Sequence, residues 1–361
     1  MDLSGSRGNL HHGIEGINMS DYLAQPTVPL EIDPADSVSD LLKKMGKTSF
    51  QSRSLATAMS IWADMLDDKV LIFMGLAGAM SAAGMRKVVS YLIENRYVDC
   101  IVSTGANLFH DMHECLGRYH FLGTPQVNDV ELQEQGIDRI YDTYAKEREF
   151  RNLDNMIGEF AQTLDLKRAY STREFFNLLG EKIWSRGKQK GIVTSAYRAG
   201  IPIYCPAVAD SSVGIALATK NMKTNRPFNF NVIQDVQETA SLVAGSPNAA
   251  IISIGGGTPK NFIQQAEVTA SIHLGVEATG YKYCIQITTD APHWGGLSGC
   301  TFQESQSWGK INKKARMVAV YADATIALPI LATAVSQLVK SKIKKRRKPG
   351  FEMGQELKVK W

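Results

Sequence analysis

Short apolar runs alternate along this chain with longer amphipathic stretches. The clearest runs are Val70–Met74, Cys100–Ser103 and Ala249–Ile254, and each is followed within two residues by glycine. Runs of this length that end in small residues are typical of buried strands. The stretch 85–95 between the first two runs is predicted to be a helix. A strand, a crossover helix and a second strand form the unit of a parallel sheet, so the pattern predicts an α/β fold.

Further elements extend this pattern in both directions. Strands are predicted at Ile201–Cys205, Asn229–Ile233, Tyr281–Thr288 and Val318–Ala322, and helices at Ser37–Met45, Phe50–Asp67, Asp138–Lys146 and Thr172–Ser185. The whole predicts a doubly wound, mostly parallel sheet with helices on both faces. Such sheets bind ligands at the carboxyl ends of their strands.

The two ends of the chain differ from the middle in composition. Residues 1–35 show no clear period and are predicted to be an N-terminal arm, residues 36–338 the catalytic domain, and residues 339–361 a basic tail. The run Lys340–Lys348 supplies much of the net charge of +4. It is typical of a solvated helix end, and the alternative is binding to nucleic acid or another anionic surface. Met1–Met19 contains no long apolar stretch, so neither a signal peptide nor a membrane span is expected.

The five cysteines are widely spaced and odd in number, and they form no Cys-x-x-Cys pair. This usage argues against a zinc site and favours a reducing cytoplasm. His110 and His113, with His120 nearby, could share a helix face, but their spacing matches no common metal motif. We therefore expect ordinary helix positions there and no metal.

Two kinds of residue at predicted strand ends could bind a nucleotide. The strand Ala249–Ile254 runs into three glycines, 255–257, which would let the backbone approach a phosphate, although a tight turn without a ligand is an equal alternative. Asp323 and Asp210 follow other strands. An acid in this place can accept hydrogen bonds from a ribose, and a helix N-cap role is about as common.

The segment from Gln286 to Lys310 is rich in glycine, tryptophan and threonine and follows a predicted buried strand. Loops of this kind are more often functional than idle. A lysine attacks an imine carbon only when its amine is neutral, and burial against Trp308 would lower the pKa of Lys310. Glu304 could shuttle a proton. Without further information, a surface lysine remains the simpler interpretation of Lys310.

Taken together, these residues resemble the deoxyhypusine synthase family. The resemblance runs from about residue 40 to about 335, and it is strongest in Ile254–Gly257, Ser307–Ile311 and Val320–Thr325. It implies a Rossmann-like fold that binds NAD and a homotetramer with active sites at dimer interfaces. It also implies removal of a hydride from spermidine, loss of 1,3-diaminopropane, and transfer of the aminobutyl unit through a lysine imine. The acceptor is a protein lysine in deoxyhypusine synthase itself and putrescine in the related homospermidine synthases.

The resemblance also implies roles for individual residues. Lys310 would form the imine, Trp308 would line its pocket, and Glu304 would be an acid of the site. The matching NAD-contacting positions are Thr104, Asp210, Gly256, Gly257, Thr289, Asp323 and Ala324, with the turn Gly75–Gly84 nearby.

Several positions of the substrate pocket depart from the family. Two acids that hold the ammonium groups of spermidine are Ile215 and Leu297 here, and a tyrosine of the pocket is Gln286. The remaining changes are Asn261 for a histidine, Gln265 for an asparagine, His110 for an acid, and Gly78-Ala79 for a serine-asparagine pair. An unpaired buried ammonium costs several kcal/mol as a rough scale. Other acids must therefore replace the lost pair, or the substrate is bound differently, or it is less cationic.

Three functions remain open from the sequence. The leading hypothesis is an NAD-dependent aminobutyl transferase of the bacterial deoxyhypusine synthase-like type, acting on polyamines or related amines, with a small amine as acceptor. The second is a true deoxyhypusine synthase that modifies a protein lysine, against which Ile215 and Leu297 argue. The third is an idle NAD-binding regulator whose basic end binds nucleic acid, although the retained Trp308 and Lys310 argue against idleness. No membrane partner is expected.

Overall fold

The structure, a computed structural model, describes residues 23–276 and 279–361. Most of the predicted N-terminal arm, residues 1–22, lies outside the described residues. Residues 23–37 form no helix or strand, and the first described elements are the helices α2 (Val38–Met45) and α3 (Phe50–Asp67). Both helices begin within one residue of their predicted starts.

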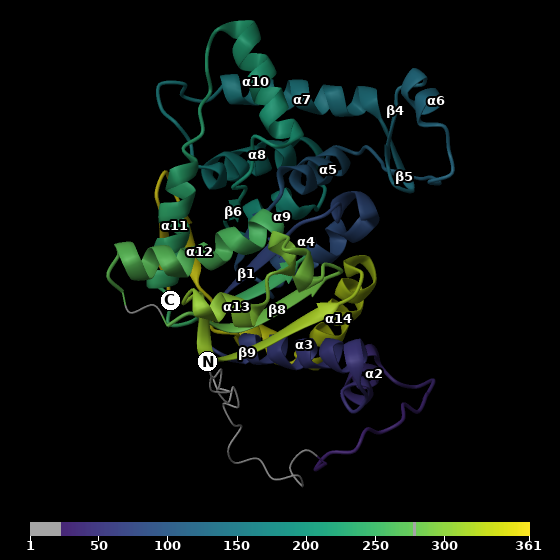
Figure 1. Ribbon diagram of the computed structural model, residues 1–361. Helices are drawn as coiled ribbons and strands as arrows, with labels where there is room; N and C mark the ends of the chain where they lie inside the picture. Colours follow the sequence, from purple (N-terminus) through teal and green to yellow (C-terminus); the bar gives the residue numbers. More distant parts are fainter. Residues whose placement is uncertain (1–22, 277–278) are drawn as a thin grey trace, which may run out of the picture.

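A six-stranded parallel sheet forms the centre of the molecule (Figure 1). Its strands lie in the spatial order β6 (Ile203–Tyr204), β2 (Cys100–Ser103), β1 (Leu71–Leu76), β7 (Ala249–Ile254), β8 (Tyr281–Thr288) and β9 (Ile311–Tyr321). All five neighbouring pairs are parallel. The predicted doubly wound α/β sheet is therefore confirmed. The order reverses between β1 and β7, so the ligand crevice of such a fold is expected at their carboxyl ends.

Helices cover both faces of this sheet, and each face has its own hydrophobic core. Side chains of β1 point alternately into one core and the other. Ile72 and Met74 belong to the larger core, and Leu71 and Phe73 belong to the smaller one. The larger core also contains residues of α3, α4 (Arg86–Glu94), α5 (Gly105–Cys115), α9 (Ile192–Ala199) and α14 (Ala324–Leu338). The smaller core contains residues of α11 (Val232–Ala244), α12 (Gly257–His273) and α13 (Phe302–Ser307).

A more polar region extends beyond the β6 edge of the sheet (Figure 1). It comprises α6 (Asp129–Glu134), α7 (Glu147–Gln162), α8 (Thr172–Gly187), α10 (Ser212–Thr224) and a small antiparallel sheet of β3 (Phe121–Leu122), β4 (Ile137–Ile140) and β5 (Thr143–Lys146). The prediction of a helix at 138–146 is wrong, because β4 and β5 pair as a hairpin. The strand predicted at 229–233 is also wrong: Asn231 caps α11, and only Phe230 makes a single β-bridge, with Tyr170.

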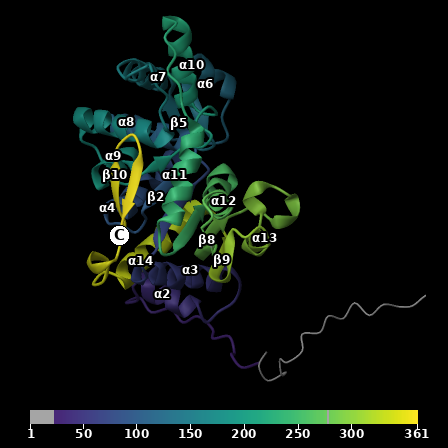
Figure 2. The same cartoon turned by 90° about the vertical axis from the view of Figure 1, so that its left-hand side faces the viewer.

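The basic C-terminal segment is folded onto the domain. A short turn, η4 (Ile343–Lys345), leads to a hairpin of β10 (Gly350–Met353) and β11 (Leu357–Lys360), which lies beside α8 and α11 in Figure 2. Arg346 is fully buried against Asp99, and Arg173 of α8 donates to the carbonyls of Gly354 and Gln355. Arg346 and the hairpin are therefore packed on the domain, whereas the other basic residues of Lys340–Lys348 are exposed. No helix among the described residues is both long and apolar enough to cross a membrane.

Candidate active site

The residues predicted to bind the cofactor lie at one edge of the central sheet. Thr104 follows β2, Asp210 lies on the loop after β6, and Thr289 follows β8. Asp323 is the N-cap of α14, and Ala324 is the first residue of that helix. Gly256 and Gly257 follow β7. Because all six strands are parallel, these loops emerge at the same edge, which is where doubly wound folds bind ligands.

The glycine turn after β7 packs closely against two other loops. Gly255 has a φ of +73°, and a Cβ there would lie 3.2 Å from that of Ala77, in the turn after β1. A Cβ on Gly256 would lie 2.6 Å from the Cα of Ser298, so any residue other than glycine would force the backbone to move. The Gly257 N–H donates to the Ser298 hydroxyl at 3.0 Å. The turn therefore brings the β1 loop, the start of α12 and the 297–299 turn together.

A cavity of about 330 Å³ opens beside this turn, on the β1–β2–β6 side. Its lining includes Gly78, Thr104, His110, Asp210 and Thr258. Burial, with a further contribution from His120, lowers the pKa of His110 to about 4, so its ring is neutral at physiological pH. Two of the predicted cofactor residues, Thr104 and Asp210, thus line one cavity with the histidine that replaces a family acid. Asp323 instead accepts a hydrogen bond from the Thr325 N–H as the N-cap of α14.

Lys310 lies between α13 and β9, and its side chain meets the second turn of α12. Its Nζ donates to the Asn261 Oδ1 at 3.1 Å and lies 5.6 Å from the centre of the Trp308 ring. Trp308 itself is 69% exposed. Within one chain, the pair therefore does not form the dry pocket that the sequence suggested. Of the two predicted pocket residues on α12, Asn261 contacts Lys310, while Gln265, one turn later, is exposed.

Gln286 lines a small cavity of about 190 Å³ together with Thr288 and Ser298, but its amide group is bonded within the protein. It is 2% exposed, and its Nε2 donates to the carbonyls of Gly255 at 2.9 Å and Ser298 at 2.8 Å. Its Oε1 accepts from the Nζ of Lys260 at 2.8 Å. Gln286 thus connects the glycine turn to the segment that leads to Lys310, and all its polar atoms have protein partners.

Lys260, in the first turn of α12, was missed by the sequence analysis. It is 1% exposed, and its Nζ donates to Gln286 and to the carbonyl of Cys300. Burial lowers the pKa of Lys260 to about 8. A faint signal was present in the sequence: at helical spacing, Lys260 shares a face with Ile263, Gln264 and Glu267, all of which are buried.

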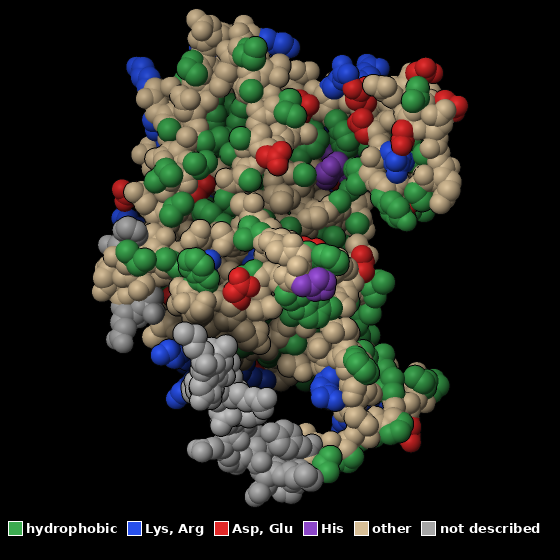
Figure 3. All heavy atoms as spheres, viewed as in Figure 1, with side chains coloured by type: hydrophobic (Ala, Val, Ile, Leu, Met, Phe, Trp, Pro, Cys, Tyr) green, Lys and Arg blue, Asp and Glu red, His purple; other side chains and the backbone are tan. Residues whose placement is uncertain are grey.

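Apolar side chains lie exposed around the Lys310 segment. Trp294 is 75% exposed and Leu297 48% exposed, in addition to Trp308. Figure 3 shows apolar side chains and a histidine together on this face, between the places that α13 and α14 take in Figure 1. Glu304, in the first turn of α13, is also exposed. Large exposed apolar side chains near a candidate site are typical of a surface that is covered by a ligand or a partner.

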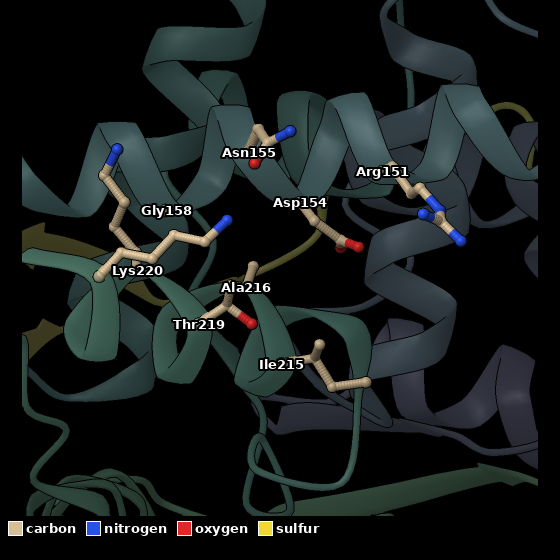
Figure 4. Close-up of a pocket in the computed structure, with 9 residues that line it drawn as sticks. Arg151, Asp154, Asn155, Gly158, Ile215, Ala216, Thr219 and Lys220 are labelled. Carbon is tan, nitrogen blue, oxygen red and sulfur yellow. The ribbon is translucent and has the colours of Figure 1, made fainter.

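Ile215 lies apart from this segment. It is on α10 and lines a groove of about 460 Å³ between α7 and α10, opposite Asp154 (Figure 4). Leu297 lies instead on the short turn before α13. The single chain therefore does not bring together the two positions where the family has acids.

The histidine pair is part of a packed cluster on α5. His110 Nδ1 lies 2.9 Å from His120 Nε2, and His120 Nδ1 lies 2.7 Å from a Glu114 carboxylate oxygen. Burial also lowers the pKa of His113 to about 4. In the part of the chain that the structure describes, no group of three or more histidine, cysteine, aspartate or glutamate side chains is placed to hold a metal ion.

Comparisons with known proteins agree with this geometry. Residues 40–335 match the family model for deoxyhypusine synthase. A probable deoxyhypusine synthase 2 of Methanosarcina mazei is 48% identical over 95% of this chain and 96% of its own length. A deoxyhypusine synthase-like protein of Chlorobaculum parvum is 39% identical over 82% of this chain and 85% of its own. A crystal structure described as a deoxyhypusine synthase from Entamoeba histolytica has a TM-score of 0.61 at 18% identity, covering 84% of this chain and 95% of that one.

Proposed function

Because the chain belongs to the deoxyhypusine synthase family and is thus a transferase of aminobutyl groups, we propose that it works with NAD and through Lys310. The donor is spermidine or a related polyamine, and the acceptor is a small amine. NAD supplies the oxidation, since it takes up a hydride from the donor and returns it after transfer. The Lys310 amine attacks the resulting imine carbon, 1,3-diaminopropane leaves, and the aminobutyl unit stays on Lys310 until the acceptor amine displaces it.

The observation that carries this proposal is the contact between Lys310 and Asn261. Asn261 lies in the second turn of α12, and the first turn of that helix begins at the glycine turn. The nucleophile thus lies within one helical turn of the edge where the cofactor candidates gather. Glu304, in the helix just before Lys310, is available to move protons during imine formation and hydrolysis.

The groups at the carboxyl ends of the strands suit NAD. The cavity beside Thr104 and Asp210 offers a hydroxyl, a carboxylate and a neutral imidazole, which suit the hydroxyl groups of a nucleotide. The close packing at Gly256 leaves the backbone, rather than a side chain, facing this edge. Thr289 and Asp323 lie on the other half of the same edge.

The proposal includes assembly of several copies, with the site completed at an interface. Its support is the exposure of three large apolar side chains on the segment that leads to Lys310, Trp294, Leu297 and Trp308, together with the partly exposed Lys310 side chain. A second copy that covered this group would exclude water from the amine. All five cysteines are free thiols, which supports work in a reducing compartment such as the cytoplasm.

Borohydride trapping tests the proposal. The protein is incubated with spermidine and NAD, treated with borohydride, and digested for mass spectrometry. We expect an aminobutyl adduct on the peptide that contains Lys310, no adduct without NAD, and none in Lys310→Arg. Lys313→Arg, a nearby exposed lysine, is the matched control and keeps the adduct. A protein that binds NAD but gives no adduct with spermidine, putrescine or agmatine contradicts the proposal.

A protein lysine is the second candidate acceptor. It is favoured by the names of the archaeal relatives and by the open face around Trp308, which would admit a large acceptor. Radiolabelled spermidine separates the two acceptors. Label in homospermidine or another small amine supports the first candidate, and label on an added hypusine-type acceptor protein supports the second.

A further inference from the structure

A chain of hydrogen bonds connects α5 with the cavity beside Thr104 and Asp210. His110 and Glu114 lie on α5, and His120 lies just before β3. The Nδ1 of His110 lies 2.9 Å from the Nε2 of His120, whose own Nδ1 lies 2.7 Å from a carboxylate oxygen of Glu114. His110 also lines the cavity. We call Glu114, His120 and His110 the histidine relay.

The relay is packed into the protein rather than spread over its surface. The ring of Phe150 lies 5.2 Å from that of His110, centre to centre, and the side chain of His120 is 5% exposed. His110 is neutral at physiological pH because burial lowers its pKa to about 4. The other charged and titratable groups that face the relay or its neighbouring residues are Arg86, Asp111, His113, Arg118, Glu149 and Asp210.

The direction of the hydrogen bonds follows from the carboxylate. Burial acts to raise the pKa of Glu114, but the hydrogen bond from His120 and the charge of Arg86 outweigh it and hold that pKa below its ordinary value. An ionised carboxylate only accepts, so the Nδ1 of His120 donates. The Nε2 of a neutral His120 then accepts, which places the proton of His110 on Nδ1 and leaves its Nε2 with a free lone pair.

This lone pair is available to a ligand. The Nε2 of His110 makes no hydrogen bond to any of the described residues, and it is not among their buried polar atoms. Because the opposite nitrogen of the ring is bonded to His120, Nε2 is the nitrogen that His110 offers to the cavity that it lines.

A single added proton removes this acceptor, whichever group takes it up. A proton on His110 itself occupies Nε2 directly. A proton on His120 makes its Nε2 a donor to the Nδ1 of His110, and the proton of His110 must then sit on Nε2. Protonation of Glu114 reverses both hydrogen bonds and has the same result. The relay thus behaves as one titrating unit.

We propose that Glu114 and His120 are positioning residues that hold His110 in the tautomer with its proton on Nδ1, so that Nε2 accepts a hydrogen bond from a hydroxyl group of the cofactor. His110 thereby does what a carboxylate does, without adding a negative charge. The part that concerns the cofactor rests on the proposed use of NAD. The part that concerns the tautomer does not.

Nuclear magnetic resonance of protein labelled with nitrogen-15 at its seven histidines tests the tautomer. The shift of a ring nitrogen shows whether it carries a proton, and the signals of His110 are those missing from His110→Gln. Spectra are recorded without NAD at pH 8, above the ordinary histidine pKa of about 6.5. We expect a proton on Nδ1 and none on Nε2. A proton on Nε2 overturns the proposal.

Two variants test the positioning role. His120→Phe leaves the buried Nδ1 of His110 without an acceptor, so the proton should move mainly to Nε2. Glu114→Gln, a smaller change that serves if His120→Phe does not fold, can accept or donate and should give a mixture of tautomers. His113→Gln is the matched control and keeps the parent tautomer, because His113 shares no hydrogen bond with His110. A parent tautomer in both Glu114→Gln and His120→Phe overturns the positioning role.

Addition of NAD tests the remaining step. A hydroxyl donor and a proton compete for one lone pair, so saturating NAD should lower the pH midpoint at which Nε2 becomes protonated. The dissociation constant for NAD at pH 8, measured by calorimetry, should rise about fivefold in His120→Phe, which corresponds to the loss of one hydrogen bond. An unmoved midpoint and an unchanged dissociation constant overturn the role toward the cofactor. Neither measurement depends on whether Lys310 gives an adduct with spermidine.

Discussion

Removal of Arg346 tests how the basic C-terminal segment is held. Its guanidinium makes a bidentate pair with Asp99, one oxygen of which lies 2.9 Å from Nη1, and it also donates to the carbonyls of Arg96 and Val70. Arg346 and Asp99 have side chains that are 0% exposed. Asp99 also accepts from the Ile72 N–H in β1 at 2.9 Å. Arg346→Met would therefore leave the buried Asp99 carboxylate with Arg96 as its remaining ion partner, whose Nη2 lies 3.0 Å from Oδ1.

The size of the effect follows from this geometry. Removing one partner of a buried ion pair typically costs about 3–5 kcal/mol. At about 2.1 cal/mol/K of unfolding entropy per residue, a chain of 361 residues has about 0.76 kcal/mol/K. Because Arg96 still pairs with Asp99, the lower end of this range applies, and the melting temperature of Arg346→Met should fall by about 4 °C. Arg347→Met is the matched control, because Arg347 is the next residue and is exposed, and it should change the melting temperature by less than about 1 °C.

Differential scanning calorimetry of the two variants, at one protein concentration and pH, measures both shifts. The double variant with Asp99→Asn should recover part of the loss, because it removes the uncompensated charge. Equal melting temperatures for Arg346→Met and Arg347→Met would refute the reasoning, and the segment would then be a tail held by its hairpin alone.

Two further predictions concern the glycine turn and the histidine cluster. Gly256→Ala forces a Cβ to within 2.6 Å of the Ser298 Cα and should cost about 1–3 kcal/mol of unfolding free energy. Gly350→Ala is the control and should be neutral, because a Cβ there meets open space. Thermal melts and NAD titrations of the two variants check this prediction. Burial lowers the pKa of His113 from its ordinary value of 6.5 to about 4, so the folded state favours the neutral ring. The free energy of unfolding should therefore fall as the pH drops from about 6.5 towards 4. His113→Gln should flatten that part of the plot of melting temperature against pH. A profile for His113→Gln that parallels the parent protein's would count against the second prediction.

The central strands could be predicted from the sequence because they are buried on both faces. β2, β7 and β8 begin and end at the predicted residues, and every residue of β2 and β7 is buried. A continuous apolar run of this length has few other solutions once glycine follows it.

The hairpin of β4 and β5 could not be predicted in the same way. Its turn consists of Tyr141 and Asp142, and Tyr141 has a φ of +53°, a conformation for which asparagine or glycine is the usual signal. The strands are partly exposed and carry charged residues, so their alternation is weak. A mixed polar stretch of this kind resembles an exposed helix as much as a strand.

The candidate site was predictable residue by residue but not as an arrangement. Lys310 and Asn261 were both chosen from the sequence, but their 3.1 Å contact depends on how α13 packs on α12. Gln286 was predicted as a residue of the substrate pocket, and the structure adds that its side chain donates to the carbonyl of Gly255 in the glycine turn. Lys260 was overlooked because a lysine at the start of a helix normally faces solvent, and only the tertiary structure places carbonyl and amide oxygens around it.

The charges around Lys310 bear on the substitutions that set this chain apart. Spermidine is a polycation, and the family resemblance implies two acids for it where this chain has Ile215 and Leu297. The structure adds a buried positive charge, Lys260, and offers only Glu304 as a nearby carboxylate. Loss of negative charge and the presence of a second cation act in the same direction, since both weaken the hold on an ammonium group close to the nucleophile. A site of this kind suits an amine that reaches Lys310 with its charged groups held elsewhere, on carboxylates that the single chain does not bring to Lys310.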